Sequence, residues 1–309
     1  MADGRVPRVR RPYVVVCLQG GLGNQLFQYA SGLGIATTLG AELRFDSFEL
    51  RPDEHWLPDL VGSDYRAATT RELVGVGVLH GGTGLAEKLA RNLLREGVDL
   101  GRRARRLSPR VEPRSGAVDR VAAFDEQILR ADPPVYLQGF FQTERWFDNV
   151  AGHVARQLAV PVVEAPRQVP GRPVVAVSFR RGDYVRFGWE LPLSYYERAL
   201  TRMLVEVPDA TFLVLGDDPE FVHFATAWVA GYGPAASAYD HGAGELTHLA
   251  LGAACDHAVL ANSTFAWWGA WIGDQRANGA RRVVVAPQDY PNRFGPDILR
   301  PSWISITSS

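Results

Sequence analysis

The second half of this chain alternates short apolar runs with helical patterns, and this alternation constrains the fold more than any other feature. The strand-like runs are residues 174–179, 211–215, 257–261 and 282–286, the last strand we expect. The helical patterns between them are residues 195–205, 219–229, 245–252 and 265–272. Strands that alternate with helices predict a parallel sheet whose ligand site lies at the carboxyl ends of the strands.

The first half opens on the same pattern. Residues 13–18 form a β-branched apolar run that ends at Gly20-Gly21, and helical periodicity begins at Asn24. Residues 41–46 have the pattern of a second strand, and a helical pattern covers residues 144–158. A glycine-rich turn between a strand and a helix is typical of a doubly wound α/β domain.

Residues 161–173 contain four prolines and one glycine, and we expect them to link two domains. The expected domains are residues 13–160 and residues 174–309. A chain of 309 residues exceeds the usual size of a single core and suits two α/β domains that face a cleft.

Charge and cysteine content exclude several classes of protein. Lys+Arg 33 nearly balance Asp+Glu 34, which argues against nonspecific binding to nucleic acid. Cys17 and Cys255 are too few for a structural zinc site or a disulfide scaffold. Since no apolar run approaches about 18 residues, we expect neither a signal peptide nor a membrane anchor.

Two adjacent arginines, Arg180 and Arg181, stand at the end of the first strand of the second half, and Gly182 and Asp183 follow them. Guanidinium groups suit the oxygens of a phosphate, and two of them at a strand end indicate a diphosphate ligand. The alternative is an arginine–aspartate ion pair at the surface.

Asp217 and Asp218 follow the next strand. A carboxylate at this position can accept hydrogen bonds from a ribose hydroxyl or a base N–H, and two adjacent carboxylates could hold a divalent metal. Asp218 also precedes Pro219, a pair typical of a helix start, so it could equally cap a helix. We assign nucleotide recognition to Asp217.

Asn262, Ser263 and Thr264 lie between a strand and a helix. Hydroxyls and free backbone N–H groups at a helix N-terminus form an anion site. Serine and threonine also cap helices without any ligand, and that alternative stays open. We expect the three tryptophans of the following helix to pack in the core rather than to present a platform for a sugar.

The turn at residues 20–26 resembles a dinucleotide-binding fingerprint, with Asp46 about twenty residues on. Leu26 occupies the position of the third glycine, and no Gly-Lys-Ser/Thr follows, so neither this fingerprint nor a P-loop applies. The turn nevertheless brings backbone amides and the side-chain amides of Asn24 and Gln25 to the edge of the expected cleft.

Taken together, the motifs resemble glycosyltransferase family 11, the inverting α-1,2-fucosyltransferases. They follow one another over nearly the whole chain, with weak coverage only at about residues 50–130. The matching segments are Gly20-Gly-Leu-Gly-Asn-Gln-Leu-Phe-Gln-Tyr-Ala30, Gly139-Phe-Phe-Gln142, Arg180-Arg-Gly-Asp-Tyr184, Pro192-Leu-Ser-Tyr-Tyr196, Leu215-Gly-Asp-Asp218, Cys255-Asp-His257 and Asn262-Ser-Thr-Phe-Ala-Trp-Trp-Gly-Ala-Trp271.

The resemblance implies a GT-B-like fold with two Rossmann-type domains facing a cleft. Residues 174–309 would bind GDP-β-L-fucose, and residues 13–160 would present a galactoside acceptor, which receives fucose on its 2-hydroxyl with inversion. No metal or other cofactor is expected, because arginines and helix-terminal donors would bind the diphosphate. The protein would act in the cytoplasm in glycan or polysaccharide synthesis. The basic segment at residues 80–116 could be a solvated helix and loop, or it could contact a membrane that carries glycan precursors.

Individual site residues follow from the same resemblance. The implied GDP-fucose-binding residues are Asn24, Arg180, Arg181, Asp217, Asn262, Ser263 and Thr264. The two arginines match donor-phosphate positions, and Asn24 matches a position close to the diphosphate and fucose. The clear departure is Ser178, because the family usually has histidine two residues before the arginine pair. With serine at this position, the contribution that the family's histidine makes to the shape of the donor pocket is not expected here.

Inversion needs one displacement at the anomeric carbon and a base that accepts the acceptor proton. Asp183 is our first candidate base because it follows the phosphate-binding arginines, of which Arg180 assists departure of the diphosphate; Glu190 and Asp46 are weaker candidates. Asp183 could instead orient an arginine through an ion pair, and the departing phosphate could itself take the proton.

Two other functions stay open at this point. One is a fucosyltransferase of another linkage or acceptor, including protein O-fucosylation, which shares related arginine and Gly-Asn-Gln motifs. The other is a nonenzymatic nucleotide or glycan binder, supported by the missing histidine at Ser178. The segment at residues 262–271 favours the α-1,2-fucosyltransferase over a fucosyltransferase of another linkage or acceptor.

Overall fold

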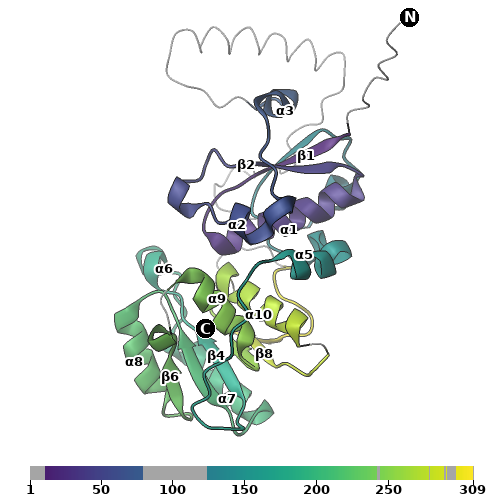
Figure 1. Ribbon diagram of the computed structural model, residues 1–309. Helices are drawn as coiled ribbons and strands as arrows, with labels where there is room; N and C mark the ends of the chain where they lie inside the picture. Colours follow the sequence, from purple (N-terminus) through teal and green to yellow (C-terminus); the bar gives the residue numbers. More distant parts are fainter. Residues whose placement is uncertain are drawn as a thin grey trace, which may run out of the picture.

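The structure, a computed structural model, describes residues 11–78, 124–241, 244–277, 279–288, 290 and 297–308. Two parallel sheets lie one above the other in Figure 1, with α1, α5, α9 and α10 between them. The basic segment at residues 80–116 lies outside the described residues, so its expected contact with a membrane stays a prediction.

The first sheet has the strand order β2-β1-β3, and all of its strands are parallel. The helices and strands of this half are β1 (Tyr13–Cys17), α1 (Leu22–Thr38), β2 (Glu42–Asp46), α2 (Leu57–Val61), α3 (Thr70–Gly75), β3 (Val135–Gln138) and α5 (Ala151–Gln157). Val16 of the central strand pairs with Phe45 on one side and Leu137 on the other. Strand β3 was not predicted from the sequence.

The second sheet has six parallel strands in the order β6-β5-β4-β7-β8-β9. Its helices and strands are β4 (Val174–Ser178), α6 (Gly182–Phe187), α7 (Leu193–Glu206), β5 (Thr211–Leu215), α8 (Pro219–Val229), β6 (Ala235–Ser237), α9 (Glu245–Ala254), β7 (His257–Val259), α10 (Thr264–Arg276), β8 (Val284–Pro287) and β9 (Ile304–Ile306). Numbered within this half, the order is 3-2-1-4-5-6, which is the doubly wound Rossmann arrangement.

Two local expectations were wrong. The helix expected at residues 144–158 is broken into two 3-10 turns, Glu144–Trp146 and Asp148–Val150, before α5 begins. Phe147, whose side chain is fully buried, interrupts it with a non-helical φ of -138°. The strand expected at residues 282–286 begins only at Val284 and is not the last, since β9 pairs with it.

The largest hydrophobic core is continuous between the two halves. Its centre is an aromatic cluster in which the Phe27 ring of α1 lies 4.6 Å from Trp267 of α10, centroid to centroid. Phe147 stacks on Trp268 at 5.7 Å. The three tryptophans of α10 are fully buried, which confirms that they pack in the core.

Two parallel sheets flanked by helices confirm the expected α/β class and its GT-B-like arrangement. Residues 161–173 contain neither helix nor strand and connect α5 to β4, but the core crosses this boundary, so the two-domain division stays a prediction. Among the described residues, no helix is long and apolar enough to span a membrane.

Candidate active site

The strand order places the loops of both sheets at one location. In a doubly wound sheet, ligands bind beyond the carboxyl ends of the strands where the chain changes direction. That point lies between β4 and β7 in the second sheet and between β1 and β3 in the first. The four loops that follow these strands contribute residues to a single cavity of about 550 Å³.

Two helix N-termini meet at this cavity. Gly21, the N-cap residue of α1, has no side chain, so the first N–H groups of α1 stay available. α10 begins at Thr264, and its N-cap Ser263 accepts a hydrogen bond from the Phe265 N–H. A Cβ atom added to Gly23 would lie 2.6 Å from the Phe265 nitrogen, so only glycine permits this close approach of α1 to α10.

The cavity brings together most of the predicted site residues. Its predicted lining residues are Asn24, Arg180, Asp183, Asp217, Ser263 and Thr264, and Ser178 lines it as well. Part of the remaining lining is small and apolar, including Gly252 of α9 and Gly269 of α10, where the two helices are in contact. The cavity therefore combines a charged rim with an apolar interior.

Arg180 is held between two carboxylates. Its guanidinium lies 2.5 Å from an oxygen of Asp183 and 2.6 Å from an oxygen of Asp217, and it faces the ring of Tyr184 at 5.1 Å. Arg180 is about one third exposed. The alternative reading of this motif, an arginine–aspartate ion pair, is therefore present, and it lies at the rim of the cavity.

Arg181 lies outside the cavity lining. Its guanidinium covers the Phe221 ring at 4.1 Å and lies 3.4 Å from a carboxylate oxygen of Asp218. Asp218 caps α8 by accepting from the Phe221 N–H, as its capping alternative predicted. Asp217 accepts from the Arg181 N–H at 2.8 Å, so it organises the arginine loop.

Asn262 is also absent from the cavity lining. It is buried, and its side-chain NH2 donates to the Trp189 carbonyl at 2.7 Å. Its own carbonyl accepts from the Tyr184 hydroxyl at 3.2 Å. In this arrangement Asn262 fixes the segment that carries Trp189, itself a lining residue.

The three candidate bases occupy different surroundings. Asp183 lines the cavity, and its side chain is half-exposed. Glu190 is not among the lining residues. Asp46 is buried at the end of β2, where it accepts from the Tyr136 hydroxyl at 2.7 Å, and it does not line the cavity either.

Sequence reasoning assigned no role to several lining residues, among them Gln142, Tyr239, Glu245 and His248. Burial raises the pKa of Glu245 against the opposing effect of Arg180, and burial lowers the pKa of His248. Gln142 follows the unpredicted strand β3. Glu245 begins α9 at the residue that the sequence predicted, but only the packing of α9 in the folded molecule shows that it lines the cavity.

Within the described ranges, no group of three or more histidine, cysteine, aspartate or glutamate side chains is placed to hold a metal ion. Transfer of fucose without a metal ion therefore stays a prediction.

Comparison with known proteins assigns this chain to a family. The sequence profile of Glycosyl transferase family 11 matches residues 122–307. The O-antigen biosynthesis glycosyltransferase WbnK of Escherichia coli is 25% identical over 142 residues, which is 42% of this chain and 44% of that protein. The match thus spans less than half of the relative's length.

Solved structures to which this chain is similar include the fucosyltransferase NodZ and FUT1. NodZ from Bradyrhizobium is 12% identical, with a TM-score of 0.44, over 85% of this chain and 93% of that one. An Arabidopsis thaliana FUT1 variant in complex with GDP is 13% identical, with a TM-score of 0.49, over 93% of this chain and 72% of that one.

Proposed function

Because the chain belongs to glycosyltransferase family 11, we propose that it is an inverting α-1,2-fucosyltransferase. It transfers L-fucose from GDP-β-L-fucose to the 2-hydroxyl of a terminal galactoside. Residues 174–309 bind the donor, and residues 13–160 present the acceptor in glycan or polysaccharide synthesis.

One observation carries the donor assignment: the N-termini of α1 and α10 meet at a cavity that Arg180 also lines. Helix N-termini and guanidinium groups both favour an anion, and the diphosphate of a sugar nucleotide carries its charge where the glycosidic bond breaks. The apolar interior of the same cavity suits a nucleoside.

The reaction breaks the bond between the fucose anomeric carbon and the diphosphate oxygen and forms a bond from that carbon to the acceptor oxygen. The acceptor proton passes to a base, for which we propose Asp183. Arg180, Ser263 and the backbone N–H groups at the two helix N-termini stabilise the negative charge on the departing GDP. Asp217 holds Arg180 in place for this role.

The test is incubation of the purified protein with GDP-fucose and lactose, followed by identification of the product. A 2'-fucosylated product is expected. Fucose on another hydroxyl would replace the proposed linkage, and tight GDP binding without turnover would indicate a binding protein. Activity should survive EDTA; if EDTA abolished it and Mg²⁺ restored it, the metal-independent mechanism would be wrong.

A further inference from the structure

The loop that follows β3 is held by buried polar side chains of α1. Gln28 donates to the Gly139 carbonyl at 3.0 Å, and Ser31 donates to the Phe141 carbonyl at 3.1 Å. Both side chains are completely buried. Because a buried polar group is costly unless it is hydrogen-bonded, these contacts fix residues 139–142 against α1.

The loop adopts an unfavourable backbone at one residue. Phe141 has a φ of 48°, in the left-handed region that a residue with an aromatic side chain rarely occupies. The side chain of the next residue, Gln142, is buried. Its side-chain amide oxygen (Oε1) has no hydrogen-bond partner in the part of the chain that the structure describes. Backbone strain and an unsatisfied polar group at one loop are features that concentrate at functional sites.

This loop brings Gln142 to the side chain of Asn24. The NH2 group of Gln142 donates to the Asn24 side-chain oxygen at 2.9 Å, and the Thr264 hydroxyl donates to the same oxygen at 3.2 Å. Two donors from opposite halves of the molecule therefore set the orientation of one amide. Because the Asn24 oxygen faces Gln142 and Thr264, the Asn24 NH2 group points away from these two residues.

That NH2 group lies over Gly20. A Cβ atom added to Gly20 would lie 2.6 Å from the Asn24 amide nitrogen, and Gly20 has a φ of 74°. Gly20, Asn24, Gln142 and Thr264 all line the cavity. The absence of a side chain at Gly20 keeps the Asn24 donor open to the cavity at the point where the two helix N-termini meet.

We propose that Gln142 is a positioning residue for the transfer reaction: it orients the Asn24 amide so that its NH2 group donates to an oxygen of the donor diphosphate. The role rests on the proposed function, because it needs a diphosphate in this cavity. The contact gains strength as negative charge develops on the departing GDP, so it contributes chiefly to kcat.

Gln142→Glu tests the orientation, because a carboxylate has nearly the shape of the amide but cannot donate to the Asn24 oxygen. The Asn24 amide then turns over, donates to Glu, and presents its oxygen to the diphosphate. We expect kcat to fall about 10²-fold, as when one oxyanion donor is removed. Gln142→Met leaves Thr264 as a donor to Asn24, so in this variant kcat should fall less, by about tenfold or less.

A double-mutant cycle separates positioning from a merely structural role. If Gln142 acts through Asn24, Gln142→Glu should have no further effect on kcat or on GDP affinity once Asn24 is alanine. Equal effects of Gln142→Glu in the Asn24 and Asn24→Ala backgrounds would overturn the proposal. Melting temperatures of all variants exclude losses caused by unfolding, and Gln142→Met serves if the glutamate variant does not fold.

Gln127→Glu is the matched control, because Gln127 is exposed in the 3-10 turn Glu126–Arg130 and undergoes the same change of charge. It should retain full kcat. Wild-type protein that neither binds GDP nor transfers fucose would overturn the proposed function and this role with it. Normal wild-type transfer combined with an additive cycle would overturn the role of Gln142 alone.

Discussion

Arg180 lies between two carboxylates, and this arrangement determines what its removal should do. In Arg180→Ala, the carboxylates of Asp183 and Asp217 lose their shared cation and should repel the diphosphate of the proposed donor. We expect turnover to fall at least about 10²-fold. Because Arg180 is about one third exposed, the free energy of unfolding should change by less than about 1 kcal/mol.

Turnover with GDP-fucose and a melting curve check this prediction together. Arg172→Ala is the control, since Arg172 is a half-exposed arginine that pairs only loosely with Asp209, at 3.8 Å. Near-normal turnover in Arg180→Ala would show that the diphosphate binds without this guanidinium.

Substitution of Asp183 distinguishes a role as the catalytic base from a role in orienting Arg180. Asparagine at this position can still accept a hydrogen bond from Arg180 but cannot take a proton. If Asp183 is the base, Asp183→Asn should lower kcat by about 10²-fold or more while GDP affinity changes little. A loss of less than about threefold would assign the proton to another acceptor, such as the departing phosphate. Steady-state kinetics and GDP titration provide the two measurements.

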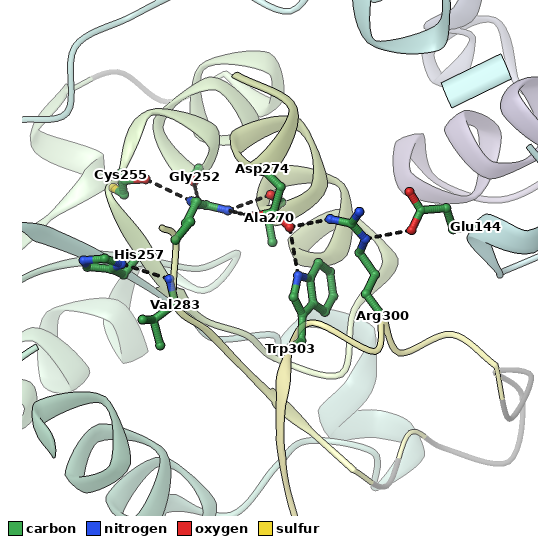
Figure 2. Close-up of polar contacts among 10 residues, drawn as sticks. Glu144, Gly252, Cys255, His257, Ala270, Asp274, Val283, Arg300 and Trp303 are labelled. Carbon is green, nitrogen blue, oxygen red and sulfur yellow. Dashed lines mark hydrogen bonds and ion pairs between the residues drawn. The ribbon is translucent and has the colours of Figure 1, made fainter. Parts of the chain in front are cut away.

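We expect His257 to make the free energy of unfolding depend on pH. Burial lowers the pKa of its imidazole, and Arg282 and Arg281 act in the same direction while Asp256 opposes them. Its Nδ1 accepts from the Val283 N–H at 3.0 Å, a contact that protonation would break (Figure 2). Burial also lowers the pKa of His55 and His248.

Below the ordinary histidine pKa of about 6.5, these histidines are protonated in the unfolded chain but bind fewer protons in the folded chain. The free energy of unfolding should therefore fall as pH drops from about 7.5 to about 5.5, by at most about 1.4 kcal/mol per pH unit for one histidine. Urea titrations at several pH values measure it. The slope should be shallower in His257→Asn, whose side-chain oxygen can still accept from Val283; an unchanged slope would exclude His257 as a source.

At the scale of elements, the approach of α1 to α10 depends on Gly23. A Cβ atom there would lie 2.6 Å from the Phe265 nitrogen and 2.7 Å from the Thr264 hydroxyl oxygen, and a helix backbone cannot yield without moving α10. We expect Gly23→Ala to lower the free energy of unfolding by about 1–3 kcal/mol, as in other overpacked contacts.

Gly269→Ala is the matched control for that prediction. Gly269 lies within α10, and the nearest atoms to an added Cβ are 3.8 Å away, an ordinary contact. Alanine in a helix interior with room for its methyl group should be neutral or stabilising, by up to about 1 kcal/mol. Chemical denaturation compares the two variants, and a Gly23→Ala protein as stable as Gly269→Ala would contradict the close approach.

The elements that the sequence predicted well are those with continuous hydrophobic periodicity. Strand β5 and helix α8 have the expected bounds, because each has an unbroken pattern between clear turn residues. Strand β3 has four residues and was missed, although the segment after it, Gly139-Phe-Phe-Gln142, was among those that resemble the family. β6 and β9, with three residues each, were missed as well.

The candidate site was predictable in position but not in detail. Residues at strand ends were expected to converge, and six of the eight predicted site residues line one cavity. Local spacing could not show that Arg181 covers Phe221 or that Asn262 binds the Trp189 carbonyl. Those orientations depend on α8 and on the segment after α6, which pack against the loops only in the folded molecule.

At the scale of the whole molecule, a charged network joins the two halves beside their aromatic core (Figure 2). Glu144, from the first half, accepts from the Trp271 indole at 2.7 Å and from Arg300 at 2.7 Å. Arg300 also pairs with Asp274 at 2.5 Å, and Asp274 accepts from the indole of Trp303. Because core and network both cross the boundary, the two halves should unfold together.

Arg300→Met tests how much this network contributes to holding the halves together. The side chains of Arg300, Glu144 and Asp274 are each only about one fifth exposed, so removal of the cation leaves two carboxylates short of a partner in partly buried surroundings. We expect a loss of about 2 kcal/mol in the free energy of unfolding, below the range for a fully buried pair. Arg145→Met is the control, because Arg145 is half-exposed and pairs with Asp297 at 3.0 Å, so its loss should stay below about 1 kcal/mol.

Denaturation followed by tryptophan fluorescence and by far-ultraviolet circular dichroism should give one coincident transition for the wild-type protein. Separate transitions would show that the halves unfold independently, and equal losses in the two variants would show that Arg300 contributes no more than an ordinary surface arginine.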